Sequence, residues 1–113
     1  MRLPAKEPYP AQVYIMQARD TSVKVGISNV PEARRNEVCW MNGGGVVLLW
    51  ASHRVRYPTV VERRVREILC ESHLKGEWYS CSAIEAKRAV DMAIADVERH
   101  VATANVRKAR ARK

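Results

Sequence analysis

The residues of this chain best suited to binding chemistry are cations near its C-terminal end. The chain carries 20 lysines and arginines against 12 acidic residues, a formal net charge of +8, and no acidic residue follows Glu98. The last seven residues hold five of the cations: Arg107, Lys108, Arg110, Arg112 and Lys113. Because neutralised phosphates release counterions, this surplus favours a polyanion such as nucleic acid. A solvated, frayed end is the alternative reading.

Two other groups have the residue types of a binding site but lack its pattern. Cys70, His73 and Cys81 could ligate zinc, yet structural zinc sites show two paired-ligand clusters and only one is present. The three cysteines are odd in number and are expected to be reduced, small buried residues. The glycines at 43–45 lack the Lys-Ser/Thr of a phosphate-binding loop, which favours a flexible turn.

The elements that position these residues must fit one small domain. The 113 residues, 47% of them hydrophobic, are enough for one core. No apolar run approaches the roughly 18 residues of a membrane span. The N-terminus lacks the apolar block of a secretion signal, so we expect a cytoplasmic protein. We divide the chain into an extended leader (1–11), a domain (12–104) and a basic tail (105–113).

The first predicted element is a β-hairpin over residues 12–28, because apolar and polar residues alternate on both sides of a short turn. A three-residue loop pairs Val13 with Val25 and places the aliphatic side chains on one face. The same register places Tyr14 directly across from Lys24 on the other face. A cation in that position favours the phenolate form of a tyrosine.

Three helices and a third strand complete the predicted fold. We expect helices from Pro31 to about Met41, over residues 59–73, and from residue 82 into a frayed basic end. The strand at 46–51 is apolar on both faces and is expected to be covered on both. A short extended piece lies at 77–80. The order ββαβα-α predicts an α+β fold, with a small, mainly antiparallel three-stranded sheet flanked by helices.

Capping and core positions follow from the same patterns. Thr59 with Glu62, and Ser82 with Glu85, fit capping boxes at the starts of the last two helices. The final helix carries an apolar stripe: Ala86, Val90, Ala93, Val97 and Val101. The three tryptophans are assigned to the core: Trp40, Trp50 and Trp78.

In this order of elements, over about residues 12–96, the chain resembles the GIY-YIG nuclease superfamily. Val-Tyr-Ile at 13–15 and Lys-Val-Gly-Ile-Ser at 24–28 stand where the two signatures lie. Arg34 matches the arginine of the first helix, and Glu62 matches the metal-binding glutamate of the second. Gly-Glu-Trp-Tyr at 76–79 looks like the Gly-Glu-Trp-Phe element of a phage- and bacteria-associated branch.

The chain also departs from the superfamily pattern. Gln12-Val13 replaces the Gly-Ile of the first signature, and Lys24 replaces the tyrosine of the second. Similar nucleases with lysine at that position are known. Arg66 stands where a histidine often follows the glutamate, and the late asparagine of many relatives has no clear match.

The resemblance implies metal-dependent hydrolysis of DNA phosphodiester bonds. Glu62 would hold Mg²⁺ or Mn²⁺ with several retained waters. Tyr14 would be the general base or orient the water, with Lys24 favouring its phenolate or contacting phosphate. Arg34 would clamp the phosphoryl oxygens in the transition state. Each residue also has a plainer structural explanation. Glu62 could cap its helix or pair with Arg66. Tyr14 and Lys24 could be an exposed pair on the sheet, and Arg34 could be an ordinary surface arginine.

The sequence therefore predicts a DNA endonuclease of low intrinsic sequence specificity, since no separate recognition domain is present. Single-stranded or double-stranded substrate and a homodimer are open alternatives. The rival predictions are an inactive or partner-dependent nucleic-acid-binding module of the same fold, and a protein-interaction domain. The predicted nucleic-acid-binding residues are Lys24, Arg35, Arg54, Arg63, Arg66, Arg107, Lys108 and Arg110.

Overall fold

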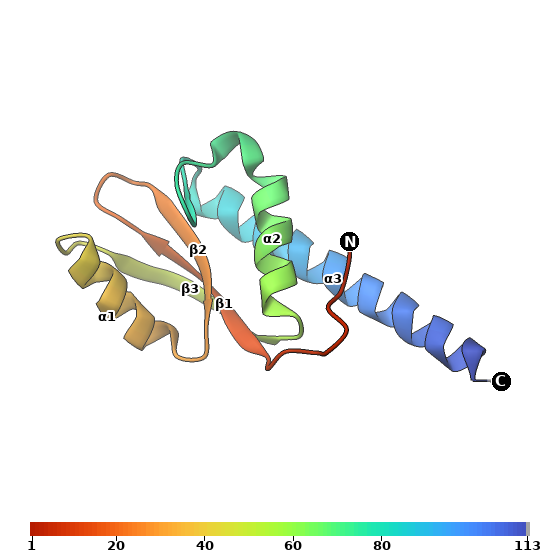
Figure 1. Ribbon diagram of the computed structural model, residues 1–113. Coiled ribbons are helices and arrows are strands. Elements are labelled where there is room, and N and C mark those ends of the chain that lie inside the picture. Colours follow the sequence, from red (N-terminus) through yellow and green to blue (C-terminus); the bar gives the residue numbers. More distant parts are fainter. Residues whose placement is uncertain (113) are drawn as a thin grey trace.

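The computed structural model describes residues 1–112 as an α+β fold with one antiparallel sheet (Figure 1). The elements in chain order are β1 (Ala11–Gln17), β2 (Val23–Ser28), α1 (Pro31–Met41), β3 (Val47–Val55), α2 (Pro58–Ile68), a 3₁₀ turn (Cys70–Ser72), β4 (Trp78–Tyr79) and α3 (Ala83–Ala111). The predicted class is confirmed. The predicted three-stranded sheet is wrong by one strand, because the short extended piece pairs with β2 and gives the order β3-β1-β2-β4.

The β1–β2 hairpin forms with a register two residues away from the predicted one. Tyr14 pairs with Gly26, and Lys24 pairs with Met16, so the lysine is not directly across from the tyrosine. Because the difference is an even number of residues, the aliphatic side chains still share one face.

The cause of the different register is a longer loop at residues 18–22. The amide of Ala18 donates to the carbonyl of Ser22 at 3.0 Å, which closes the loop two residues beyond the predicted turn. The carboxylate of Asp20 accepts from the Ser22 amide at 2.9 Å, a local bond that favours such turns.

The two faces of the sheet are covered by different helices, with α1 on one side and α2 and α3 on the other (Figure 1). The face toward α2 and α3 is the main core, and all five predicted stripe residues of α3 are buried in it. The face toward α1 holds a smaller cluster around Tyr14, Met16 and Val38. Lys24 is buried as well, with 8% of its surface exposed.

The starts of α2 and α3 differ in how they are capped. Ser82 accepts from the amide of Glu85 at 3.0 Å, which confirms the predicted cap of α3. The predicted capping box of Thr59 and Glu62 is wrong. Tyr57 is the N-cap of α2, and within residues 1–112 no side chain caps it. Proline at the first helical position removes one amide that would need a cap.

Arg107, Lys108 and Arg110 lie on a helix, because α3 continues to Ala111 instead of fraying, and Arg112 is its C-cap. Lys113 lies outside the described residues. Residues after Val101 leave the core, and Figure 1 shows this end of α3 projecting past the sheet. Residues 1–10 have no regular secondary structure, and Glu7 among them forms an ion pair with Arg56 at 2.5 Å. No helix in residues 1–112 is long and apolar enough to cross a membrane.

Several predicted core positions are exposed. Trp40 is 88% exposed, whereas Trp50 and Trp78 are half-buried and pack against the two clusters. The expectation that β3 is covered on both faces is wrong, since it is an edge strand with Val47 and Leu49 exposed. The cysteines differ in the same way: Cys81 is buried, Cys39 is half-buried and Cys70 is exposed.

Candidate functional site

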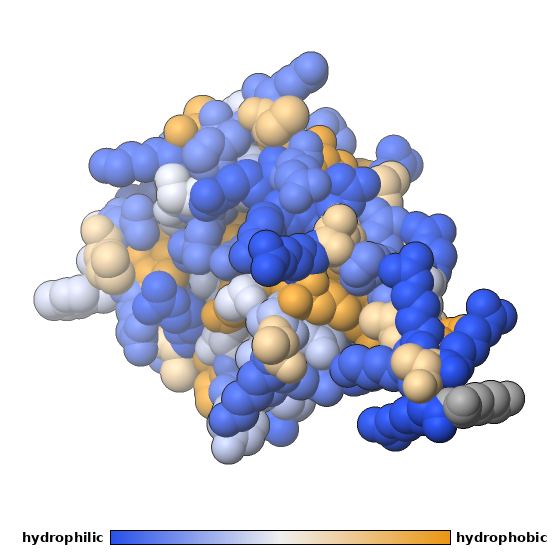
Figure 2. Space-filling model, turned by 45° about the vertical axis from the view of Figure 1, so that its right-hand side comes forward, coloured by the Kyte–Doolittle hydropathy of each residue, from blue (hydrophilic) through white to orange (hydrophobic). Residues whose placement is uncertain are grey.

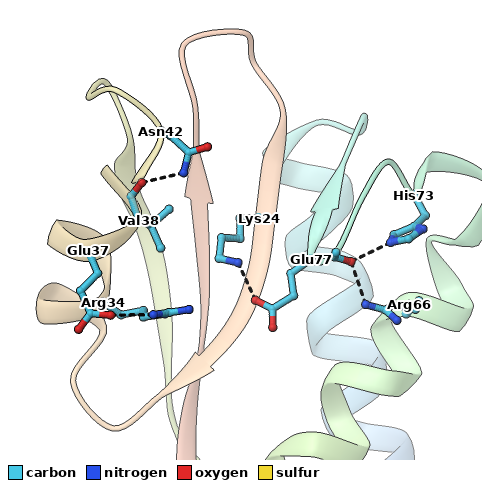
Figure 3. A network of polar contacts seen from close by, with 9 residues as sticks. Lys24, Arg34, Glu37, Val38, Asn42, Arg66, His73 and Glu77 are labelled. Atoms are coloured by element: carbon cyan, nitrogen blue, oxygen red, sulfur yellow. Dashed lines mark hydrogen bonds and ion pairs between the residues drawn. The ribbon is translucent and has the colours of Figure 1, made fainter. Parts of the chain in front are cut away.

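Five ionisable side chains, each from a different segment, lie close enough to interact with one another beside β2. They are Tyr14 of β1, Lys24 of β2, Arg34 of α1, Glu62 of α2 and Glu77 of the turn before β4. Lys24 Nζ donates to Glu77 Oε2 at 2.7 Å. Figure 3 shows Arg34 and Glu77 pointing toward Lys24 from opposite sides. The fold thus brings together all four residues predicted to be catalytic and adds Glu77.

Glycine at position 26 is required by the packing of this cluster. A Cβ atom on Gly26 would lie 2.3 Å from the phenolic oxygen of Tyr14 and 2.8 Å from Oε2 of Glu77. Both distances are shorter than any tolerated carbon–oxygen contact. Because Gly26 has no side chain, the phenol of Tyr14 and the carboxylate of Glu77 can both pack directly against the backbone of β2.

A tight turn before β4 positions Glu77. Gly76 has φ of +59°, in the left-handed region that glycine adopts without strain. Its carbonyl accepts from Arg66 Nη2 at 2.8 Å and lies 2.7 Å from His73 Nε2 (Figure 3). The carbonyl of Glu77 accepts from an amide of β2 at 3.0 Å. The backbone of Glu77 is thus attached to β2 beside Lys24.

The two carboxyl groups of the cluster have opposite pKa shifts. Burial raises the pKa of Glu62 to about 7, and the adjacent Glu77 carboxylate adds to the rise. Burial is the largest influence on Glu77 and acts to raise its pKa, but the hydrogen bond from Lys24, the interaction with Glu62 and the charges of Lys24 and Arg34 together outweigh it, and the net shift is downward. Perturbed carboxyl groups of this kind are concentrated at functional sites.

The pKa of Tyr14 moves in the direction opposite to our expectation. Burial raises it to about 12, and the charge of Glu77 adds to the rise. Arg34 lies beside the phenol and lowers the pKa in part. The prediction that Lys24 faces Tyr14 is corrected, because Lys24 pairs with Glu77 and the cation beside the tyrosine is Arg34. That guanidinium also pairs with Glu37 at 2.7 Å.

The carboxyl groups fit a hard divalent cation. Oε2 of Glu62 is buried, and within residues 1–112 it has no hydrogen-bond partner. Such an acceptor costs free energy unless it binds a donor or an ion. No group of three or more His, Cys, Asp or Glu side chains in the described chain could hold a metal. Magnesium, however, keeps several waters and is commonly bound by one or two carboxylates.

The predicted phosphate-binding cations are distributed over several surfaces. Arg66 belongs to the site through the turn at Gly76, and Lys24 is occupied by Glu77. Arg35, half-buried, lines a groove on α1. The others are exposed, on β3 (Arg54), α2 (Arg63) and the end of α3 (Arg107, Lys108 and Arg110). Figure 2 shows hydrophilic side chains gathered where α3 projects.

One functional candidate, Glu77, was missed by our sequence reasoning. The Gly-Glu-Trp-Tyr segment signalled it, but nothing local indicates that its side chain meets a lysine 53 positions earlier. The neighbouring aromatic residues are packed instead of open. Tyr79 is 2% exposed and lies edge-to-face on His73, so it is not free to stack on a base.

Comparison of the chain with protein-family models, with curated proteins and with solved structures finds no match.

Proposed function

We propose that this protein is a metal-dependent endonuclease of the GIY-YIG type, which hydrolyses DNA phosphodiester bonds with low sequence specificity. The observation that supports the proposal most directly is the convergence of Tyr14, Arg34 and Glu62 from three elements onto one cluster around Glu77. Once Glu62 is ionised, its buried Oε2 and the adjacent Glu77 carboxylate leave negative charge that a divalent cation would stabilise.

The proposed reaction needs an oriented water, neutralisation of the phosphoryl oxygens and a stabilised leaving oxygen. Arg34 supplies a planar donor pair for the phosphoryl oxygens, and phosphate would displace Glu37 from it. The phenol of Tyr14, whose raised pKa keeps it neutral, accepts a hydrogen bond from the attacking water and so orients it, and the proton released by that water passes to bulk solvent. Mg²⁺ or Mn²⁺ held through Glu62 would supply positive charge to the phosphoryl and leaving oxygens.

Lys24 has a different role in this proposal from the one expected from the sequence. Its ion pair keeps Glu77 ionised next to Glu62, the carboxyl whose pKa lies near neutrality. A divalent cation held there would compete with the proton of Glu62, and the Glu77 carboxylate beside it would offset part of the positive charge of Lys24 and Arg34. Lys24 is thus a positioning residue for the carboxylate pair.

The exposed cations would hold DNA that extends beyond the site. The end of α3 presents Arg107, Lys108 and Arg110 without an acidic neighbour after Glu98. Contacts of this kind bind the phosphate backbone and carry no sequence information. They agree with a protein whose base specificity is low.

The proposal is tested by cleavage of supercoiled plasmid and of circular single-stranded DNA, in Mg²⁺ and in EDTA. We expect cutting in Mg²⁺ only, with Glu62→Gln slower by at least about a thousandfold, which corresponds to roughly 4 kcal/mol in the activation barrier. Tyr14→Phe should be slower by about a hundredfold with DNA binding retained. Glu71→Gln, which alters an exposed glutamate off the site, is the matched control.

Two results would contradict the proposal. Equal rates for the wild type and Glu62→Gln would remove Glu62 from the reaction. DNA binding without cutting under any divalent cation would favour the inactive or partner-dependent binding module.

A further inference from the structure

The helix that carries Arg34 also has an aromatic surface that the proposed reaction does not use. Trp40 is 88% exposed and the adjacent Met41 is 74% exposed. Leaving an indole in water forgoes one of the largest gains available from burial, so such exposure commonly marks a binding surface. A shallow groove of about 510 Å³ lies beside the indole, lined by Arg35, Asn36, Cys39, Trp40, Gly43 and Gly44.

The charges around this groove are positive. Arg35 is the charged residue of the lining, and none of the six lining residues is acidic. A second guanidinium reaches the glycine turn, since Nη2 of Arg19 lies 3.9 Å from where a Cβ on Gly44 would be. A Cβ on Gly43 would meet open space, so the groove has no wall at that point.

We infer that this groove binds an unpaired base of a DNA strand whose neighbouring phosphate lies at the candidate active site. The indole offers a face on which any base can stack, and Arg35 and Arg19 offer donors to the flanking phosphates. The substrate is therefore DNA with a single-stranded segment, because bases within a duplex are already stacked on each other. The inference extends the proposed function by naming its substrate class.

The spacing along α1 fits this arrangement. Trp40 follows Arg34 by six residues, which is about 9 Å along the helix axis at 1.5 Å per residue. Stacked nucleotides rise about 3.4 Å each, so the distance corresponds to two or three nucleotides. Six residues also turn the helix by about 240°, so the strand must pass partly around α1 between Arg34 and Trp40, and this adds to the two or three nucleotides that the axial distance requires.

A polyanion suits this surface better than a protein partner does. Exposed tryptophan and arginine also occur at protein interfaces, where a ring of apolar neighbours usually surrounds them. Here the groove is lined by one cation, one amide, one thiol and two glycines around the indole. The net charge of +8 also favours a strand of phosphates.

The test is binding of the full chain, in EDTA so that cutting cannot occur, to a fluorescent oligodeoxythymidylate and to a duplex of equal length. We expect Trp40→Ala to weaken single-strand binding about tenfold, as for loss of one stacked base, and duplex binding less than about twofold. Trp40→Phe, which keeps an aromatic face, should retain most of the affinity. Ile84→Ala, which truncates a 66% exposed side chain outside the groove, is the control.

Three outcomes would overturn the inference. They are unchanged single-strand affinity in Trp40→Ala, an equal loss for single strand and duplex, and a change in self-association with DNA affinity unaltered. The third outcome would identify a contact between protein chains. Because the measurement does not involve cleavage, its result is separable from that of Glu62→Gln. If Trp40→Ala weakens single-strand binding but the wild type cuts no DNA, the proposed endonuclease activity is wrong and the base site stands. If the wild type cuts DNA but Trp40→Ala binds single strands normally, the base site is wrong and the endonuclease proposal stands.

Discussion

The two faces of the sheet are built from the same strands but depend on different kinds of contact. The face toward α2 and α3 is aliphatic, and its side chains gain free energy from any close-packed neighbour. On the face toward α1, Lys24 is buried against Glu77, and Tyr14 fits only over a glycine. Those polar groups need particular partners, because a buried charge without one is costly. The first face therefore contributes most to stability, and the second holds the polar residues of the proposed site.

The largest expected effect on stability is on the aliphatic face. Ile15→Ala removes a side chain that is 1% exposed, and we expect a loss of about 3 kcal/mol from transfer and cavity terms. Urea unfolding measures it, and the cleavage rate per folded molecule should be unchanged. Leu49→Ala, on the exposed edge of β3, should cost less than about 0.5 kcal/mol. A loss below about 1 kcal/mol for Ile15→Ala would mean that this face is not the main core.

A smaller effect is expected from breaking the ion pair on the polar face. Lys24→Met leaves the Glu77 carboxylate beside Glu62 without its cation, and we expect a loss of about 2 kcal/mol, less than for a fully buried pair since Glu77 is a third exposed. The double variant Lys24→Met/Glu77→Gln should recover about half of this loss, because it removes the unpaired charge. Unfolding of the wild type, both single variants and the double variant measures the coupling. Additive losses would show that the pair contributes nothing specific.

The same contrast explains how much of the fold could be predicted. Alternation in β1 and β2 and the helical stripe from Ala86 to Val101 identify the aliphatic face, because periodic burial is recorded in the sequence itself. The hairpin register could not be fixed in this way, since a difference of two residues leaves every side chain on its face. The local bond between Asp20 and Ser22 selects the longer loop.

The polar face was less accessible to sequence reasoning. The importance of Tyr14, Arg34 and Glu62 came from the resemblance, since each has an ordinary structural explanation by its position alone. Their electrostatic relations depend on contacts between distant segments, such as Lys24 with Glu77. The exposure of Trp40 could not be predicted either, because a large apolar residue near a helix end is more often buried.

The smallest expected effect is the pH dependence of stability that Glu62 introduces. A carboxyl whose pKa rises to about 7 on folding binds more protons in the folded state than in the unfolded state, where its pKa is about 4.3. Its contribution therefore favours folding at low pH and is lost as the pH rises toward 7. Glu62→Gln cannot ionise, so in EDTA at pH 8 it should be more stable than the wild type by about 1 kcal/mol, or roughly 4 °C in Tm. Below about pH 4, where the carboxyl is protonated in both the folded and the unfolded state, the difference should be close to zero.

Adding Mg²⁺ distinguishes two properties of Glu62: the loss of folding stability that its ionised carboxylate causes, and the proposed binding of a metal ion by that carboxylate. At pH 8 the ion should stabilise the wild type by mass action and leave Glu62→Gln unchanged, which narrows or reverses the difference between them. Glu71→Gln should follow the wild type throughout, because its carboxylate lies outside the cluster. A difference between wild type and Glu62→Gln that is independent of pH would contradict the raised pKa. If Mg²⁺ stabilises the wild type and Glu62→Gln equally, the ion binds at a site that does not include Glu62. In that case the burial of the Glu62 carboxylate would lower the free energy of unfolding without serving to bind a cation. The polar face would then reduce stability, relative to aliphatic packing, with no functional gain.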